Sequence, residues 1–148
     1  MPATNERLAV IDASLVLKTI LPNPDMSRCQ SLLAQLQGVQ LVVPALWVYE
    51  VTSTLAKAVC FKQLTVEESQ AALHQVLELD VQIVPPDEAQ SALALDWTLR
   101  LKRASAYDSF YLAIADALEA PFWTADQRLV NVMQGQKVDW LHWIGELV

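Results

Sequence analysis

Short, continuous apolar segments alternate along the chain with longer segments in which apolar residues recur every three or four positions. The short segments are typical of strands covered on both faces of a sheet, and the longer ones of amphipathic helices. This alternation predicts an α/β fold with a mostly parallel sheet of four to five strands, and right-handed crossovers would place helices on both faces. The predicted strands are residues 8–11, 40–43, 81–84, 122–124 and about 138–141, and the predicted helices are 13–21, 25–37, 44–61, 87–101 and 106–119, with two more beginning at 65 and 126.

Capping and stop signals indicate where several helices begin or end. Thr65 and Glu68 have the spacing of a capping box, and Ser105 is a candidate cap for the helix that follows it. Gly38 is a typical stop after the second helix, and Pro44 suits the first turn of the third. We therefore expect helix boundaries at these positions.

Composition restricts the class of protein. The chain has 148 residues, 53% of them hydrophobic, so residues 1–148 are expected to form one folded domain. No apolar run reaches the roughly 18 residues of a membrane-spanning helix, and residues 1–8 lack a basic-then-apolar secretory pattern. We expect a cytoplasmic protein in which the isolated thiols of Cys29 and Cys60 are reduced.

Four acidic residues are each the only charged residue of an otherwise apolar or uncharged stretch. Such stretches are usually buried, and a carboxylate is rarely buried without a partner. Any one of these acids could be a helix cap, but a shared site explains all four together. The four acids are Asp12 in residues 8–17, Glu50 in 39–56, Asp108 in 104–115 and Asp126 in 120–127.

The predicted elements bring these acids to one edge of the sheet. Asp12 and Asp126 follow the first and fourth strands, where sites form in open parallel sheets. Asp108 lies in the first turn of a helix, and Glu50 about two turns into another. Carboxylates brought together repel unless a cation compensates, and all-oxygen ligands select hard ions such as Mg²⁺ or Mn²⁺. Such an ion can activate water to hydrolyse a phosphodiester.

The same residues carry a resemblance to a known family. Taken in order, four segments resemble the acid-bearing segments of PIN-domain proteins of the kind that form the toxin half of bacterial toxin–antitoxin pairs (VapC-like). The segments are VIDAS at 10–14, VYEV at 48–51, AYDSFYLAIA at 106–115 and TADQRL at 124–129. The third is the most specific, and the match spans nearly the whole chain.

The resemblance implies a three-layer α/β/α PIN-like fold and Mg²⁺- or Mn²⁺-dependent cleavage of RNA at the four acids. It also implies a small antitoxin partner and frequent homodimerisation. Ser14 and Thr124 match positions where the family often has a small hydroxyl residue near the metal. We expect them to orient carboxylates or water by hydrogen bonds, although ordinary turn and cap chemistry is an equal alternative for both.

Two other functions stay open from the sequence. The first is a PIN-like fold kept for protein interaction or regulation without catalysis, which calorimetry with Mn²⁺ would distinguish. The second is a phosphatase of the haloacid-dehalogenase type with Asp12 as its nucleophile. That class needs a second Asp two residues later, where this chain has Ser14, so the sequence disfavours it.

Net charge and tryptophan content bear on the partners. The net charge of −7 predicts weak affinity for random RNA and a selective substrate, because an acidic surface repels phosphates. The site acids themselves account for part of that charge. Trp140 and Trp143 predict an exposed aromatic patch near the end of the chain, where a protein partner could bind.

Overall fold

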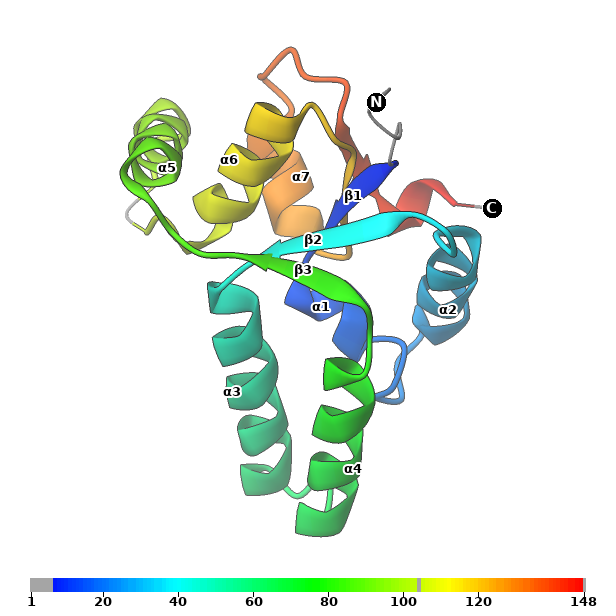
Figure 1. Cartoon of the computed structure of the whole chain (residues 1–148). Coiled ribbons are helices and arrows are strands. Elements are labelled where there is room, and N and C mark those ends of the chain that lie inside the picture. The colour runs from blue at the N-terminus through cyan, green and yellow to red at the C-terminus, as the bar shows by residue number, and fades with distance from the viewer. Residues whose placement is uncertain (1–6, 104, 148) are drawn as a thin grey trace, which may run out of the picture.

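The computed structural model describes residues 7–103 and 105–147, and these residues contain one five-stranded sheet in the order β3-β2-β1-β4-β5 (Figure 1). Every neighbouring pair of strands is parallel, which confirms the predicted mostly parallel sheet. The strands are β1 (Leu8–Ile11), β2 (Gln40–Pro44), β3 (Val81–Val84), β4 (Phe122–Thr124) and β5 (Leu141–Trp143).

Helices cover both faces of this sheet, so the three-layer α/β/α prediction is confirmed. The α3–α4 pair and α1 lie on one face, and α6 and α7 lie on the other, with α5 packed beside α6 (Figure 1). None of the helices in the described residues is long and apolar enough to cross a membrane. The helices are α1 (Ala13–Leu17), α2 (Met26–Gln35), α3 (Leu46–Cys60), α4 (Val66–Leu77), α5 (Glu88–Arg100), α6 (Tyr107–Leu118), α7 (Gln127–Met133) and a final 3₁₀ turn, η1 (Ile144–Glu146).

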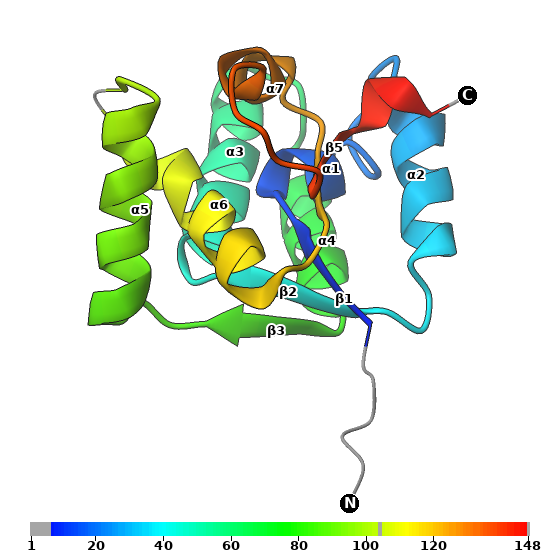
Figure 2. The ribbon, with the colours of Figure 1, turned by 90° about the horizontal axis from the view of Figure 1, so that it is seen from above.

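The strand order reverses direction between β1 and β4. From β1 the chain adds β2 and then β3 on one side, and it later returns to add β4 and β5 on the other side (Figure 2). Val10 is in register with Phe122 and Ile11 with Trp123, so Asp12, which follows β1, lies beside Thr124, the last residue of β4. Such a reversal opens a crevice at the carboxyl ends of the strands, where ligands bind in α/β folds.

The strongest end signals of the sequence are confirmed. Both hydrogen bonds of the capping box form, from the Thr65 N–H to the Glu68 carboxylate at 3.0 Å and from the Glu68 N–H to the Thr65 hydroxyl at 3.1 Å. Gly38 follows α2 with a φ of +83°, a conformation that a residue without Cβ adopts without strain. Each of these signals depends only on residues that are neighbours in sequence.

Three predicted boundaries are wrong. Pro44 is the last residue of β2, where it pairs with Val84, and α3 begins at Leu46. Ser105 does not cap α6, because the helix begins at Tyr107 and its cap residue makes no side-chain hydrogen bond. The first helix stops at Leu17 rather than Leu21. In the turns that follow it, the Asn23 side chain donates to the backbone carbonyls of Lys18 and Leu21.

The tryptophan segment near the end of the chain is not the exposed patch that the sequence predicts. It forms β5, which lies at residues 141–143 rather than 138–141. Trp140 is half-buried and packs edge-on against the buried Trp97, with ring centroids 5.9 Å apart. Trp143 is also half-buried and packs against a small second core between α2 and η1. The large apolar side chains with the greatest exposure are instead Tyr49, Phe61, Leu99 and Tyr107.

Candidate metal centre

Asp12 is a buried carboxylate whose two oxygens are both hydrogen-bonded. It follows β1 directly and caps α1, and only 8% of it is exposed. One oxygen accepts from the Ser14 hydroxyl at 2.8 Å and from the Leu15 N–H at 2.9 Å, and the other accepts from the Thr124 hydroxyl. Burial raises the pKa of Asp12, while these hydrogen bonds lower it. The hydrogen bonds favour the charged form of the Asp12 carboxylate, which burial disfavours. They also hold that carboxylate in one orientation.

Thr124 connects Asp12 to a second acid. Its hydroxyl is fully buried at the end of β4; it donates to Asp12 and accepts from the Asp126 N–H at 2.9 Å. Asp126 then caps α7 by accepting from the Arg128 N–H at 2.9 Å. The loops that follow β1 and β4 are therefore joined through a single hydroxyl, and both acids sit at the point where the strand order reverses.

Glu50 reaches the same edge of the sheet from α3. It is half-buried, and its Oε1 atom accepts from the Tyr111 hydroxyl at 2.8 Å. Burial is the largest cause that raises the pKa of Glu50, from its ordinary 4.5 to about 7; the hydrogen bond from Tyr111 opposes this rise, and the negative charges of Asp108 and Asp12 add to it. A divalent cation that binds this carboxyl group would therefore displace its proton readily near neutral pH.

Asp108 lies in the first turn of α6 and faces a cation. The Arg103 guanidinium is 3.3 Å from its carboxylate. Burial raises the pKa of Asp108, Arg103 lowers it, and the charge of Asp126 raises it further. Within the described residues, one other guanidinium nitrogen of Arg103 is buried without a hydrogen-bond partner. Arg103 therefore carries unused donor capacity next to the acids.

The four predicted acids lie within electrostatic range of one another. The charge of Asp126 raises the pKa values of Asp12 and Asp108, and the charges of Asp12 and Asp108 raise that of Glu50. Across residues 7–103 and 105–147, no three Asp, Glu, His or Cys side chains are already close enough to enclose a metal ion. The structure therefore brings the acids to one region without assembling a finished coordination sphere.

The chemistry of this donor set fits a hard divalent cation. The four side chains offer carboxylate oxygens alone, which Mg²⁺ and Mn²⁺ prefer. Arg103 is the one basic side chain among the described residues that forms an ion pair with any of the four, so their mutual repulsion is only partly offset. A divalent ion would offset the burial and the repulsion that raise the pKa values of Asp12, Glu50 and Asp108. Their role as ligands stays a prediction.

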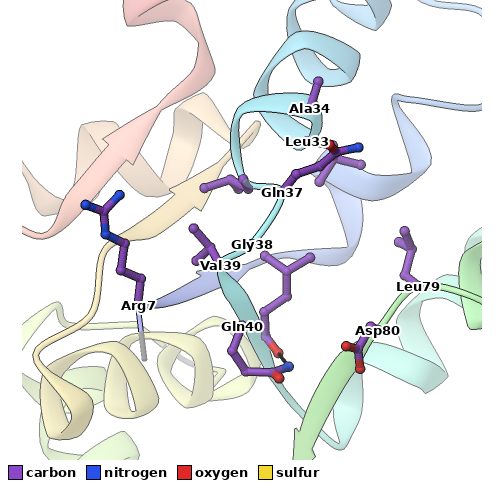
Figure 3. A pocket seen from close by; sticks show the side chains of 11 residues that line it. Arg7, Leu33, Ala34, Gln37, Gly38, Val39, Gln40, Leu79 and Asp80 are labelled. Carbon is purple, nitrogen blue, oxygen red and sulfur yellow. Dashed lines mark hydrogen bonds between the residues drawn. The ribbon is translucent and has the colours of Figure 1, made fainter. Parts of the chain in front are cut away.

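Two pockets of similar size lie on different sides of the molecule. One, of about 620 Å³, is lined by Ser14, Lys18, Glu50 and Gln63 among others, so it opens next to the acids. The other, also of about 620 Å³, is shown in Figure 3, where Arg7, Gln40 and Asp80 come from the amino ends of the strands. That second pocket is at the opposite edge of the sheet from the acids. Of these two pockets, the first therefore adjoins the candidate centre.

The sequence did not identify Tyr111 as part of this region, because its contact with Glu50 joins two helices that are distant in the chain. Arg103 belongs to a basic stretch just before the helix of Asp108, but the sequence did not show that it pairs with that acid. A weak signal was present for Tyr111, which lies three residues after Asp108 and thus on the same face of α6. Ser14 and Thr124 do hydrogen-bond to Asp12; whether they serve a metal site stays a prediction.

The chain matches the family model described as the PIN domain over residues 10–142. No curated protein matches the chain significantly. The matched segment includes the four acids together with Ser14, Thr124 and Tyr111.

Among the solved structures that are similar to this one, three illustrate the likeness. VapBC2 from Rickettsia felis, bound to a DNA fragment from its promoter, aligns with a TM-score of 0.68 at 13% identity and covers 92% of this chain and 98% of that one. A toxin–antitoxin complex from Klebsiella pneumoniae aligns with a TM-score of 0.64 at 12% identity and covers 90% and 95%. VapC20 from Mycobacterium tuberculosis, a sarcin–ricin loop cleaving toxin, aligns with a TM-score of 0.59 at 13% identity and covers 79% and 87%. At these identities the likeness shows a shared fold.

Proposed function

Because the chain belongs to the PIN domain family, we propose that it is a divalent-metal-dependent endoribonuclease, with Asp12, Glu50, Asp108 and Asp126 as its active centre. The observation that carries this proposal is the convergence of four isolated carboxylates near the reversal of strand order. There the charge of Asp126 raises the pKa values of Asp12 and Asp108, and the charges of Asp12 and Asp108 raise that of Glu50. The similar fold of VapC20, described as a toxin that cleaves the sarcin–ricin loop, supports RNA as the substrate.

Each acid has a proposed role. Asp12, Asp108 and Asp126 hold the principal ion, Mg²⁺ or Mn²⁺, and Glu50 shares in binding it or places a second one. When bound, the ion supplies activation of water and neutralisation of charge on the phosphate. Hydrolysis by in-line attack at phosphorus leaves a 5′-phosphate and a 3′-hydroxyl.

Residues around the acids orient them and the substrate. Ser14 and Thr124 fix the orientation of Asp12 through their hydroxyls, as outer hydrogen bonds do for metal ligands generally. The Arg103 guanidinium lies beside Asp108, and about a third of the side chain is exposed. Guanidinium groups pair well with phosphate oxygens, so we propose that the exposed part of Arg103 contacts the RNA backbone.

We further propose that the protein is the toxin of a toxin–antitoxin pair in the cytoplasm, with a small antitoxin partner and a homodimeric state. The similar fold of a toxin–antitoxin complex from Klebsiella pneumoniae supports the partner. Exposed apolar side chains of α3 and the α6 start, Tyr49 and Tyr107, line a shallow pocket together with Glu50. A partner that covers them would also block the active centre.

The variant Asp108→Asn tests the proposed activity. Asp108 is a better choice than Asp12, because Asp12 accepts three hydrogen bonds that hold the fold, whereas the described contacts of the Asp108 side chain are limited to the Arg103 ion pair. Asp96→Asn is the matched control, since Asp96 also pairs with an arginine, Arg100, but lies on the exposed face of α5.

We expect Asp108→Asn to lower the rate of RNA cleavage at least about 100-fold, because losing a ligand costs more than losing its outer hydrogen bonds, which costs 10–100-fold. Asp96→Asn should cleave at the wild-type rate. Cleavage is measured on a panel of structured and single-stranded RNAs with Mg²⁺ or Mn²⁺. If Asp108→Asn cleaves as fast as the wild type, the assignment is wrong. If calorimetry finds no Mn²⁺ binding to the wild type, the non-catalytic interaction domain is favoured instead.

A further inference from the structure

Tyr111 places a buried hydroxyl directly on one of the proposed ligands. It belongs to α6, and only 2% of it is exposed. Its hydroxyl donates to Oε1 of Glu50 at 2.8 Å, and Glu50 belongs to α3, 61 residues away in the sequence. Because α3 and α6 cover opposite faces of the sheet (Figure 1), this hydrogen bond ties together the two helical layers at the active centre.

The position of the Tyr111 hydroxyl is itself fixed by packing. The phenol ring stacks on Phe122 of β4, with ring centroids 5.6 Å apart and planes 5° from parallel. Phe122 is completely buried, and it pairs with Val10 of β1. The hydroxyl thus has little freedom to lose when it binds Glu50. Burial and the charges of Glu50 and Asp12 raise the pKa of Tyr111, so the hydroxyl stays a donor.

Glu50 has no comparable support from its own helix. Its side chain contains three rotatable bonds, and the charges of Asp108 and Asp12 oppose its approach to the centre. The flanking Tyr49 points to solvent with 72% of its surface exposed. Without the phenol, repulsion would favour Glu50 conformations that turn away from the other acids.

We propose that Tyr111 is a positioning residue, which holds Glu50 at the active centre through Oε1 and leaves Oε2 for a divalent cation. This inference rests on the proposed function, since it requires that Glu50 binds or places the ion. Tyr111 acts through Glu50 and touches neither substrate nor ion. The proposal adds to the active centre a second residue of α6, on the same helix face as Asp108.

The test compares Mn²⁺ affinity, measured by calorimetry, in the full-length wild type, Tyr111→Phe and Thr52→Val. Tyr111→Phe keeps the ring that stacks on Phe122 and removes the hydroxyl alone. We expect it to bind Mn²⁺ about 10–100-fold more weakly, the usual cost of losing an outer hydrogen bond to a ligand. Thr52→Val removes an exposed hydroxyl from the same helix as Glu50 and should bind as tightly as the wild type. Equal affinity of Tyr111→Phe and the wild type would overturn the proposal.

Glu50→Asp adds a second route to the same question. It keeps the carboxylate but shortens the side chain by one methylene, which takes it out of reach of the phenol. We expect Glu50→Asp to lose affinity, and the double variant with Tyr111→Phe to lose no more, because both remove one interaction. Independent, additive losses would contradict a shared role. If the wild type itself binds no Mn²⁺, the proposed function has failed, which is distinct from a wild type that binds and a Tyr111→Phe that binds equally well.

Discussion

Thr124 donates a hydrogen bond to Asp12 across 112 residues of sequence, inside the protein and at the carboxyl ends of two adjacent strands. The same hydroxyl accepts from the Asp126 N–H. Because each strand contributes one member of this arrangement, the spacing of the two acids depends on how β1 and β4 pair. The sheet and the candidate centre are therefore stabilised by the same contact.

Removing this hydroxyl should destabilise the fold. Thr124→Val keeps the shape of the side chain, but it leaves a buried carboxylate oxygen without its donor and the Asp126 N–H without its acceptor. We expect a loss of about 1–3 kcal/mol in the free energy of unfolding, measured by urea denaturation. Thr52→Val is the control, since the exposed Thr52 hydroxyl bonds only to a carbonyl of its own helix. Equal losses of unfolding free energy in the two variants would show that the buried Thr124 contacts stabilise the fold no more than an exposed hydroxyl does.

Stability of the metal-free protein should fall as pH rises from about 4.5 to 7. The folded state keeps the Glu50 proton up to a pKa of about 7, whereas the unfolded chain releases it near 4.5. In this window the folded state binds more protons, so the free energy of unfolding decreases with pH. Burial raises the pKa values of Asp12 and Asp108 too, which adds to the same trend.

The variant Glu50→Gln isolates the contribution of that one group. Gln keeps a carbonyl that accepts from Tyr111 but carries no titratable proton. With a chelator present, we expect the stability of the variant relative to the wild type to be greater at pH 8 than at pH 5. Urea denaturation at both pH values measures the difference. Parallel pH profiles of the two proteins would mean that Glu50 does not titrate in this range.

Arg103 should compete with a divalent cation for Asp108. Its guanidinium is 3.3 Å from the carboxylate, with about a third of each side chain exposed. Removing a positive charge at this distance favours a cation, so Arg103→Gln should tighten Mn²⁺ binding by up to about fivefold, the scale of a partly exposed ion pair. Arg100→Gln, which breaks the pair with Asp96 on α5, should leave Mn²⁺ affinity unchanged. Weaker Mn²⁺ binding by Arg103→Gln would indicate that Arg103 orients Asp108 instead.

Several strands were predictable because their signals are local. β1, β3 and β4 have the predicted bounds, since each is a short, largely apolar run between turn or helix signals. β5 was displaced by about three residues, because its position is set by pairing with β4, in which Phe122 lies opposite Leu141. Pairing of this kind joins strands that are distant in sequence, so its register is decided by the folded arrangement.

The residues of the candidate centre also differ in how far the sequence reveals them. The four acids could be found from sequence, because a lone charge in an apolar stretch is visible without a structure. Tyr111 and Arg103 could not, since a tyrosine in an apolar helix and an arginine in a basic loop are ordinary features until their partners are known. The pairing of Tyr111 with Glu50 across the sheet is a property of the packed layers.

A divalent cation should stabilise the folded protein and oppose the pH trend described above. At a free Mn²⁺ concentration about 100 times the dissociation constant, binding to the folded state alone adds about 2.7 kcal/mol to the free energy of unfolding. The gain should be greater at pH 8 than at pH 5, because protons on Glu50 compete with the ion at the lower pH. Thermal denaturation with and without Mn²⁺ measures both effects.

Any salt weakens the repulsion among the acids by screening their charges. The effect of Mn²⁺ bound at the centre must therefore be distinguished from ionic screening. NaCl at the same ionic strength screens exposed charges over about 10 Å or less, but it does not bind in place of protons at one centre. We expect NaCl to give only a small gain, with little difference between the wild type and Asp108→Asn. Mn²⁺ should give a large gain that Asp108→Asn loses. If NaCl stabilised the protein as much as Mn²⁺, the four carboxylates would be an acidic surface rather than a metal centre.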